Sequence, residues 1–218
     1  NKEYSLLFAD DLNAFFLFKK PGKAKASVKK FLKELEIWLC KWRLRMQPTK
    51  CNYTIFAKHC VKKEELKESF DLTLFGVKIP YEENPISLGI TFDQTLNFGM
   101  QVKKIREKCI QRLNVIKILS HKSWQLKKET LIAVYNALVG SVLNYSSFIS
   151  SQLSESNHKT IQAIQNNAIR AIFRQRYDDH VSTEALAEMS GLVPVRTRWF
   201  ELNERFLAKA LVNENELI

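Results

Sequence analysis

The chain has 218 residues, 45% hydrophobic content and a formal net charge of +11. This length suffices for one sizeable core or two small ones, and no apolar run approaches the roughly 20 residues that span a bilayer. A positive surplus of this size predicts a polyanionic partner, with an anionic membrane surface as the competing interpretation. No secretory leader is visible, so we expect a soluble intracellular protein, nuclear or cytoplasmic, with no membrane partner.

Two short apolar runs flank an adjacent pair of carboxylates, Asp10 and Asp11. We predict a strand–turn–strand hairpin over residues 4–18, with each strand buried. Desolvating two like charges side by side is costly, so such a pair favours a bound cation, and Mg²⁺ prefers carboxylate oxygens. The alternative is an ordinary solvated turn, because aspartate is common in turns.

The rest of the first half alternates one helix with short strands. Apolar residues at three- and four-residue steps predict a helix over 23–45, which should end before Gln47-Pro48. A short strand is expected at 53–57, and a charged, exposed segment should follow to about residue 69. Further strands are expected at 72–80, around Gly76, and at 86–93, which contains Gly89. The pattern predicts a small, mainly antiparallel sheet with one long packed helix.

From about residue 98 the periodicity is helical throughout. Helices are predicted over 98–117, 126–142 and 155–176, followed by a short helix from Ser182 to Gly191 and a last one opened by Pro194. The first of these carries the apolar stripe Val102, Ile105, Cys109, Leu113 and Ile116. We therefore expect an α+β fold with two domains, a mixed one over residues 1–97 and an all-helical one over residues 98–218.

Positive charge is concentrated in two blocks, residues 19–50 and 101–130. In the second block it lies on the 98–117 helix, outside the apolar stripe. A helix beside a duplex would neutralise phosphates without reading bases. The candidate nucleic-acid-binding residues are Lys103, Lys104, Arg106, Lys108 and Arg112. The alternative for this helix is a solvated charged face.

Five segments, in order, resemble motifs of reverse transcriptases. Phe8-Ala9-Asp10-Asp11 resembles the metal-binding hairpin, and residues 42–56, which contain Lys50, resemble the fourth palm motif. Residues 87–93 resemble the Leu-Gly hairpin of non-LTR elements. Residues 131–145 and 161–170 resemble the thumb segment and the Gln-Asn-Ala-Arg helix after it. Over residues 4–212 the chain thus resembles the C-terminal half of a non-LTR (LINE-type, jockey-like) retrotransposon reverse transcriptase.

This resemblance implies an RNA-directed DNA polymerase, with the distal part of the palm in residues 1–97 and the helical thumb and connection in residues 98–218. The reaction is Mg²⁺-dependent nucleotidyl transfer from a dNTP to a primer 3′-hydroxyl on two metal ions. By resemblance, Asp10 coordinates Mg²⁺ and Asp11 assists. Lys50 approaches the triphosphate, and Leu88 and Gly89 form the primer grip. The implied partners are an RNA template, a DNA primer and a dNTP, while the oligomeric state stays open.

The departures from the family bear on activity. The family has an earlier palm strand with another metal-binding aspartate, and fingers, neither of which occurs in this sequence, so we expect the chain alone not to polymerise. Phe8 stands where many reverse transcriptases have tyrosine. The alternative function is a non-catalytic nucleic-acid-binding remnant of such an element. An unrelated helical module with a fortuitous Asp-Asp turn would leave the five ordered matches unexplained.

Overall fold

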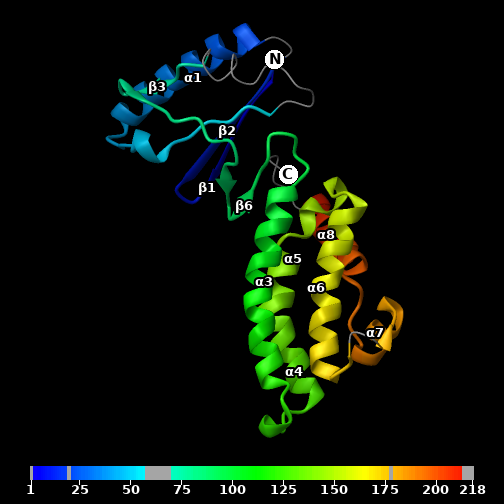
Figure 1. The fold of residues 1–218 in the computed structure, drawn as a ribbon. Coiled ribbons are helices and arrows are strands. Elements are labelled where there is room, and N and C mark those ends of the chain that lie inside the picture. The colour runs from blue at the N-terminus through cyan, green and yellow to red at the C-terminus, as the bar shows by residue number, and fades with distance from the viewer. Residues whose placement is uncertain (1, 19–20, 57–69, 177–178, 213–218) are drawn as a thin grey trace. The chain divides into compact units, whose positions relative to one another are not determined.

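The computed structural model describes residues 2–18, 21–56, 70–176 and 179–212. Helices and small antiparallel sheets make an α+β chain of two compact units, Asn1–Pro85 and Ile86–Ile218 (Figure 1). Each unit has a hydrophobic core of its own. The division at residue 85 lies before the boundary near residue 98 that the sequence suggested, so the hairpin at residues 86–91 belongs with the helices.

The first unit begins with the predicted hairpin. Strands β1 (Lys2–Phe8) and β2 (Asp11–Leu17) pair antiparallel, with Phe8 opposite Asp11, so that Ala9 and Asp10 form a two-residue loop. Ala9 has a left-handed φ of +52°, which reverses the chain within those two residues. The hairpin that the apolar flanks predicted is thereby confirmed.

The expected burial of these strands is wrong for the described residues. Leu6 and Leu7 are 55% and 73% exposed, and successive strand residues point to opposite faces, so apolar side chains lie bare on both faces of β1. On β2, Phe16 packs edge-on against Phe31 of the following helix, with ring centroids 5.3 Å apart. The hydrophobic pattern predicted the positions of the strands correctly, but the described residues do not bury their apolar side chains.

Helix α1 (Pro21–Lys41) ends one turn earlier than the sequence predicted. Arg43 adopts a left-handed φ of +54°, and the Leu44 amide donates to the Leu39 carbonyl at 2.9 Å, which is the hydrogen-bond pattern of a Schellman stop. Glycine usually holds that position, and its absence hid the helix end from sequence reasoning. The inner face of α1, around Val28 and Leu32, packs on the core of the first unit.

That core is built on a second hairpin, β3 (Thr73–Leu74) and β4 (Val77–Lys78). Its turn residues Phe75 and Gly76 both have positive φ, as a type I′ turn requires. The strand predicted at 53–57 is wrong over its described part, where Tyr53 forms one parallel bridge to Tyr81. The predicted charged segment to residue 69 lies outside the described residues.

The expectation of one sheet is also wrong within the described ranges. The strands form three separate two-stranded antiparallel sheets, the third being β5 (Ile86–Ser87) with β6 (Ile90–Thr91). Each hairpin closes on a two-residue turn, and its two strands pair with each other but with no strand of another hairpin in the described ranges. Over the residues that the structure describes, the strands therefore form hairpins rather than a continuous sheet.

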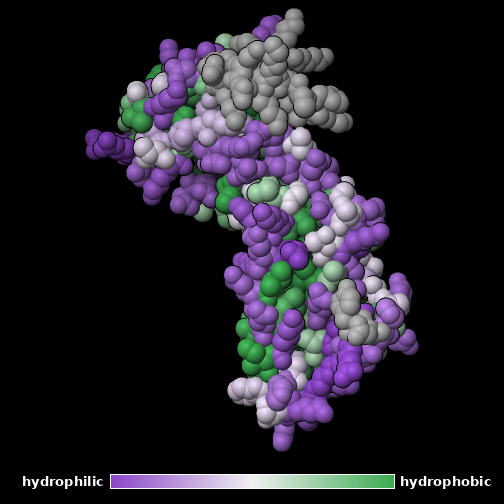
Figure 2. All heavy atoms as spheres, in the orientation of Figure 1, coloured by the Kyte–Doolittle hydropathy of each residue, from purple (hydrophilic) through white to green (hydrophobic). Residues whose placement is uncertain are grey.

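The second unit is a helical bundle in which α3, α4–α5 and α6 lie side by side (Figure 1). Its helices are α3 (Gly99–Leu119), α4 (Lys128–Tyr135), α5 (Ser141–Tyr145), α6 (Glu155–Phe173), α7 (Thr183–Ser190) and α8 (Val195–Val212). All five residues of the predicted α3 stripe are buried in the core. Ser182 caps α7 and Gly191 ends it with a φ of +66°, as the sequence predicted. Hydrophobic residues also gather on the surface over α3 (Figure 2), where Ile110, Val115 and Ile118 are exposed.

A π-helical turn, Asn136–Gly140, joins α4 to α5 within the helix predicted at 126–142. Such a turn inserts one residue and rotates the buried face that follows. Val139 is therefore fully buried, and its neighbour Leu138 is half-buried. Among the described helices, none is long and apolar enough to cross a membrane.

Candidate metal-binding hairpin and nucleic-acid interface

The carboxylate pair lies at the tip of the first hairpin. Asp10 is in the two-residue loop, Asp11 is the first residue of β2, and both are exposed. Their oxygens suit a hard divalent cation such as Mg²⁺. Within the residues that the structure describes, no group of three His, Cys, Asp or Glu side chains gathers to hold a metal. The donor set thus fits Mg²⁺ in kind but offers only two of the carboxylates that a two-metal site uses.

Lys50 ends a short 3₁₀ turn, Pro48–Lys50, in the loop after α1. Its amide donates to the Gln47 carbonyl at 3.0 Å, and the Cys51 amide donates to the Pro48 carbonyl at 3.1 Å. The side chain of Lys50 is exposed. Within the described part of the chain, neither Asp10 nor Asp11 makes an ion pair or hydrogen bond with Lys50, so the structure does not join these predicted catalytic residues directly.

The Lys50 loop is anchored through Tyr53. The Tyr53 amide donates to the Pro80 carbonyl at 3.1 Å, and its hydroxyl donates to the Phe70 carbonyl at 2.7 Å. Burial raises the pKa of the Tyr53 hydroxyl, and the nearby Tyr81 and Asp71 raise it further. A neutral hydroxyl that donates over the whole physiological range holds the loop beside the β3–β4 hairpin.

The predicted primer-grip residues, Leu88 and Gly89, form the tight turn between β5 and β6. Their φ values are +47° and +75°, so the turn is of type I′ with leucine at its first central position. The hydroxyl of Tyr145, at the end of α5, donates to the Leu88 carbonyl at 2.5 Å. This bond fixes the turn against the helical bundle despite the unfavourable conformation of Leu88.

A second, buried connection holds the same hairpin. The Thr91 amide donates to the Gln101 side-chain oxygen on α3 at 3.0 Å, and the Gln101 amide group donates to the Ser146 hydroxyl at 3.5 Å. Sequence reasoning assigned no role to Tyr145, Gln101 or Ser146. One signal for this connection was present in the sequence, because Gln101 directly precedes the apolar stripe of α3. The Gln101 side chain is buried, and a buried polar side chain needs a hydrogen-bond partner.

The turn geometry predicts opposite outcomes for two glycine-to-alanine changes. Gly89→Ala should destabilise the chain by about 1–2 kcal/mol, because alanine is strained at positive φ. Gly99→Ala should stabilise it by about 0.4–1 kcal/mol, because Gly99 begins α3 with ordinary φ and open space around the added methyl. Urea unfolding followed by far-ultraviolet circular dichroism measures both, and equal effects would contradict the left-handed turn.

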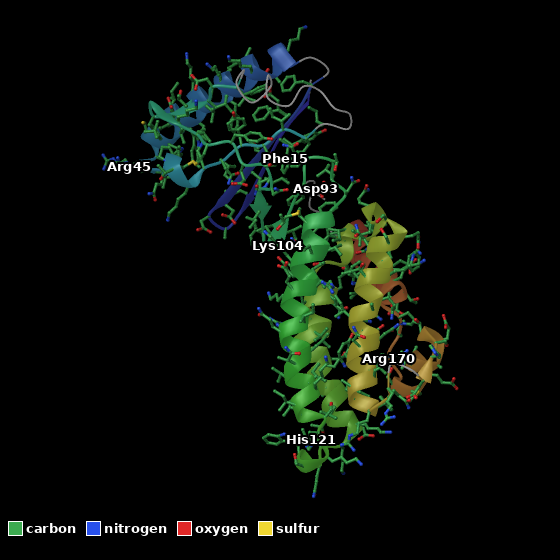
Figure 3. All side chains as sticks on the ribbon, viewed as in Figure 1. Phe15, Arg45, Asp93, Lys104, His121 and Arg170 are labelled. Carbon is green, nitrogen blue, oxygen red and sulfur yellow. The ribbon has the colours of Figure 1, made fainter. Side chains whose placement is uncertain are left out.

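The basic residues of α3 divide into two groups. Lys103, Lys104, Arg106 and Lys108 are exposed and free to meet a polyanion. Arg112 is half-buried, and its guanidinium donates to the Leu138 carbonyl in the π-helical turn, a contact that stabilises the fold. Lys104, Lys108 and Arg112 follow each other at four-residue spacing, about 6 Å apart along the helix axis. Figure 3 marks Lys104 near the beginning of α3.

Among curated proteins, the chain is similar to an RNA-directed DNA polymerase of a transposon. This relative is the Drosophila melanogaster protein named "Probable RNA-directed DNA polymerase from transposon BS", which is 27% identical over 165 residues. The match covers 76% of the chain but 18% of the relative, so the chain spans less than a fifth of that protein in the aligned region. The similarity confirms the resemblance that the five ordered motifs predicted. No family model matches the chain, and no solved structure matches it.

Proposed function

We propose that this chain is the distal palm and thumb part of a non-LTR retrotransposon reverse transcriptase, which transfers nucleotides from dNTPs to a primer 3′-hydroxyl on an RNA template. The observation that carries the proposal is the hairpin tip, where a two-residue turn presents Asp10 and Asp11 to solvent between two apolar strands. The similarity to a transposon polymerase over most of the chain supports the same assignment.

In this proposal each site residue has a distinct role. Asp10 and Asp11 would hold Mg²⁺, which lowers the pKa of the attacking hydroxyl and neutralises the leaving pyrophosphate when it is bound. Lys50 would bring an ammonium donor toward the triphosphate from its anchored loop. Leu88 and Gly89 would hold the sugar-phosphate chain of the primer. Because Gly89 has no side chain, the primer can approach the backbone of the turn closely.

The exposed apolar faces of the first hairpin also support a palm. Large apolar side chains on both faces of β1 are unfavourable in water, and they would be buried if further strands and a covering layer packed there. A third carboxylate on such a strand would complete the metal ligands. The test of the polymerase assignment is primer extension by the chain joined in cis to an upstream reverse-transcriptase half.

Nucleic-acid binding by α3 can be tested on the chain itself. Lys104→Gln/Lys108→Gln should reduce the slope of log affinity against log salt by about 2. Each phosphate that a lysine neutralises releases about one counterion, so the loss of two such contacts reduces the number released by about two. The measurement is fluorescence anisotropy of a labelled RNA–DNA hybrid duplex across a KCl series. The control, Lys159→Gln/Lys209→Gln, removes the same charge from exposed positions on α6 and α8. Equal slopes in the two variants would leave α3 a solvated face.

The second candidate function is a nucleic-acid-binding remnant without catalysis. Two observations favour it: the pair of carboxylates lacks a third ligand within the described ranges, and the basic residues of α3 remain exposed. Such a protein would bind the duplex as the parent polymerase does. Its binding would be indifferent to Asp10, and no synthesis would follow when the upstream half is added.

A further inference from the structure

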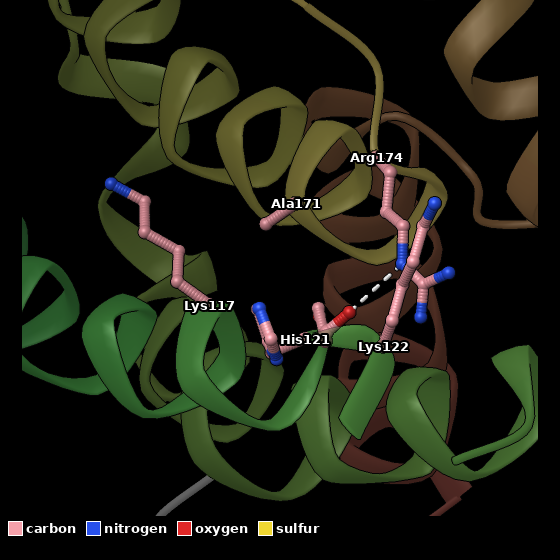
Figure 4. Close-up of a pocket in the computed structure, with 6 residues that line it drawn as sticks. Lys117, His121, Lys122, Ala171 and Arg174 are labelled. Carbon is pink, nitrogen blue, oxygen red and sulfur yellow. Dashed lines mark hydrogen bonds between the residues drawn. The ribbon is translucent and has the colours of Figure 1, made fainter. Parts of the chain in front are cut away.

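A basic pocket lies between the C-terminal ends of α3 and α6 (Figure 4). Its lining has four basic side chains and no carboxylate, and consists of Lys117, Ser120, His121, Lys122, Ala171 and Arg174. The lysines, the histidine and the arginine are all exposed.

Arg174 is fixed at one wall of the pocket. Its Nε donates to the Ser120 carbonyl at 2.9 Å, and the buried Ser120 hydroxyl donates to the Ile116 carbonyl at 2.7 Å. Arg174 itself ends α6 with a left-handed φ of +55°. One N–H group of the guanidinium therefore satisfies the end of α3, while the two terminal nitrogens remain available to an acceptor.

His121 adds a directed donor. Its Nδ1 accepts from the Ser123 amide at 3.3 Å and lies 2.8 Å from the Ser123 hydroxyl. Because Nδ1 is the acceptor of a backbone N–H, the proton of the neutral ring belongs on Nε2. His121 consequently offers an N–H donor without needing to be charged.

The basic side chains of the pocket are not neutralised by neighbouring carboxylates within the described ranges. The negative ends of α3 and α6 account for some basic residues at this end of the bundle, and Arg174 makes such a contact. Within the described ranges, however, Lys117, Lys122 and Arg174 form no ion pair with a carboxylate. Ala171 on the facing helix leaves space between them (Figure 4). The lining therefore carries positive charge without a carboxylate to neutralise it, and this chemistry matches a phosphate group.

We propose that this pocket binds a backbone phosphate of a nucleic acid, as a contact separate from the exposed basic face of α3. This inference rests on the nucleic-acid binding contained in the proposed function. His121 lies at the opposite end of the bundle from Lys104 (Figure 3), and the part of α3 from Lys104 to its end at Leu119 rises by about 22 Å. A chain that binds at both places would contact phosphates spread over most of one helical turn of a duplex.

The test uses Lys117→Gln/Lys122→Gln in the full chain and leaves Arg174 intact, because its bond to Ser120 stabilises the end of α3. Anisotropy with a fluorescein-labelled RNA–DNA hybrid duplex should show about tenfold weaker binding at low salt and a salt slope smaller by about 2. The control Lys159→Gln/Lys209→Gln should change affinity less than twofold. Free phosphate is distinguished by following the His121 ring signals in NMR titrations with inorganic phosphate alone and with the duplex.

Each outcome is decisive. Equal binding by the pocket variant and the control, with the parent still binding, overturns the pocket and leaves the proposed function standing. A parent chain that fails to bind the duplex overturns nucleic-acid binding itself. His121 signals that move with inorganic phosphate but not with the duplex assign the pocket to a free anion. Vesicles that contain phosphatidylserine test the membrane alternative. If the pocket variant binds these vesicles less well than the parent while its duplex binding is unchanged, the pocket binds a membrane surface and the proposal is overturned.

Discussion

Asp10→Ala should abolish Mg²⁺-dependent primer extension by the chain joined in cis to an upstream reverse-transcriptase half, with a loss of about a thousandfold or more. The physical reason is that a metal-bound carboxylate contributes several kcal/mol of transition-state stabilisation, and each 1.4 kcal/mol corresponds to about a factor of ten in rate. Because Asp10 is exposed in a two-residue loop, its removal should leave the fold intact. The measurement is the initial rate of incorporation of a labelled dNTP.

Two further variants make the result specific. Asp10→Asn keeps the shape of the side chain but removes its charge, and it should be almost as inactive as Asp10→Ala. Asp71→Ala removes an exposed aspartate of the same unit, whose partner is Lys78 at 3.4 Å, and it should retain parental activity. The isolated chain should extend no primer. Extension by the isolated chain, or equal activity of Asp10→Ala and the parent, would contradict the metal-binding role.

Local patterns in the sequence predicted the helices well because burial on one face repeats every three to four residues. The α3 stripe from Val102 to Ile116 is buried throughout, and Ser182 and Gly191 bound α7 as expected. The helix ends at Arg43 and Arg174 were missed, because each is a non-glycine residue at positive φ. The π-helical turn after Tyr135 was missed for a similar reason, since no residue type marks the inserted position.

The candidate site was predictable only where neighbouring residues carry it. Asp10 and Asp11 are adjacent, and the apolar runs beside them identify the hairpin tip. The support of the Leu88-Gly89 turn comes from Tyr145, which is 57 positions away and is joined to it by one hydrogen bond. The pocket joins the end of α3 to Arg174, 54 positions after Ser120. Contacts between residues so far apart in the sequence depend on how the helices pack. Composition and periodicity do not predict which of these residues meet.

Trp199→Ala should be the most damaging substitution to the stability of the helical unit, at about 4 kcal/mol. The side chain is 0% exposed in the core, and its Nε1 donates to the Leu143 carbonyl at 2.9 Å. Truncation leaves a cavity and a carbonyl without its donor, which together explain the magnitude. Urea unfolding followed by helical circular dichroism measures it. Trp199→Phe should lose about 1–2 kcal/mol because it keeps most of the volume but not the donor.

Phe206→Ala is the matched control on the same helix, because Phe206 is 68% exposed and its truncation should change stability by less than about 0.5 kcal/mol. The consequence of Trp199→Ala should reach the Leu88-Gly89 turn. Leu143 lies two residues before Tyr145, and Asn203 of α8 bonds the Ser147 carbonyl at 3.1 Å, so α8 holds the segment that fixes Leu88. Amide hydrogen exchange in β5–β6 should therefore accelerate in Trp199→Ala and remain parental in Phe206→Ala. Unchanged exchange in both would mean that the hairpin is held independently of α8.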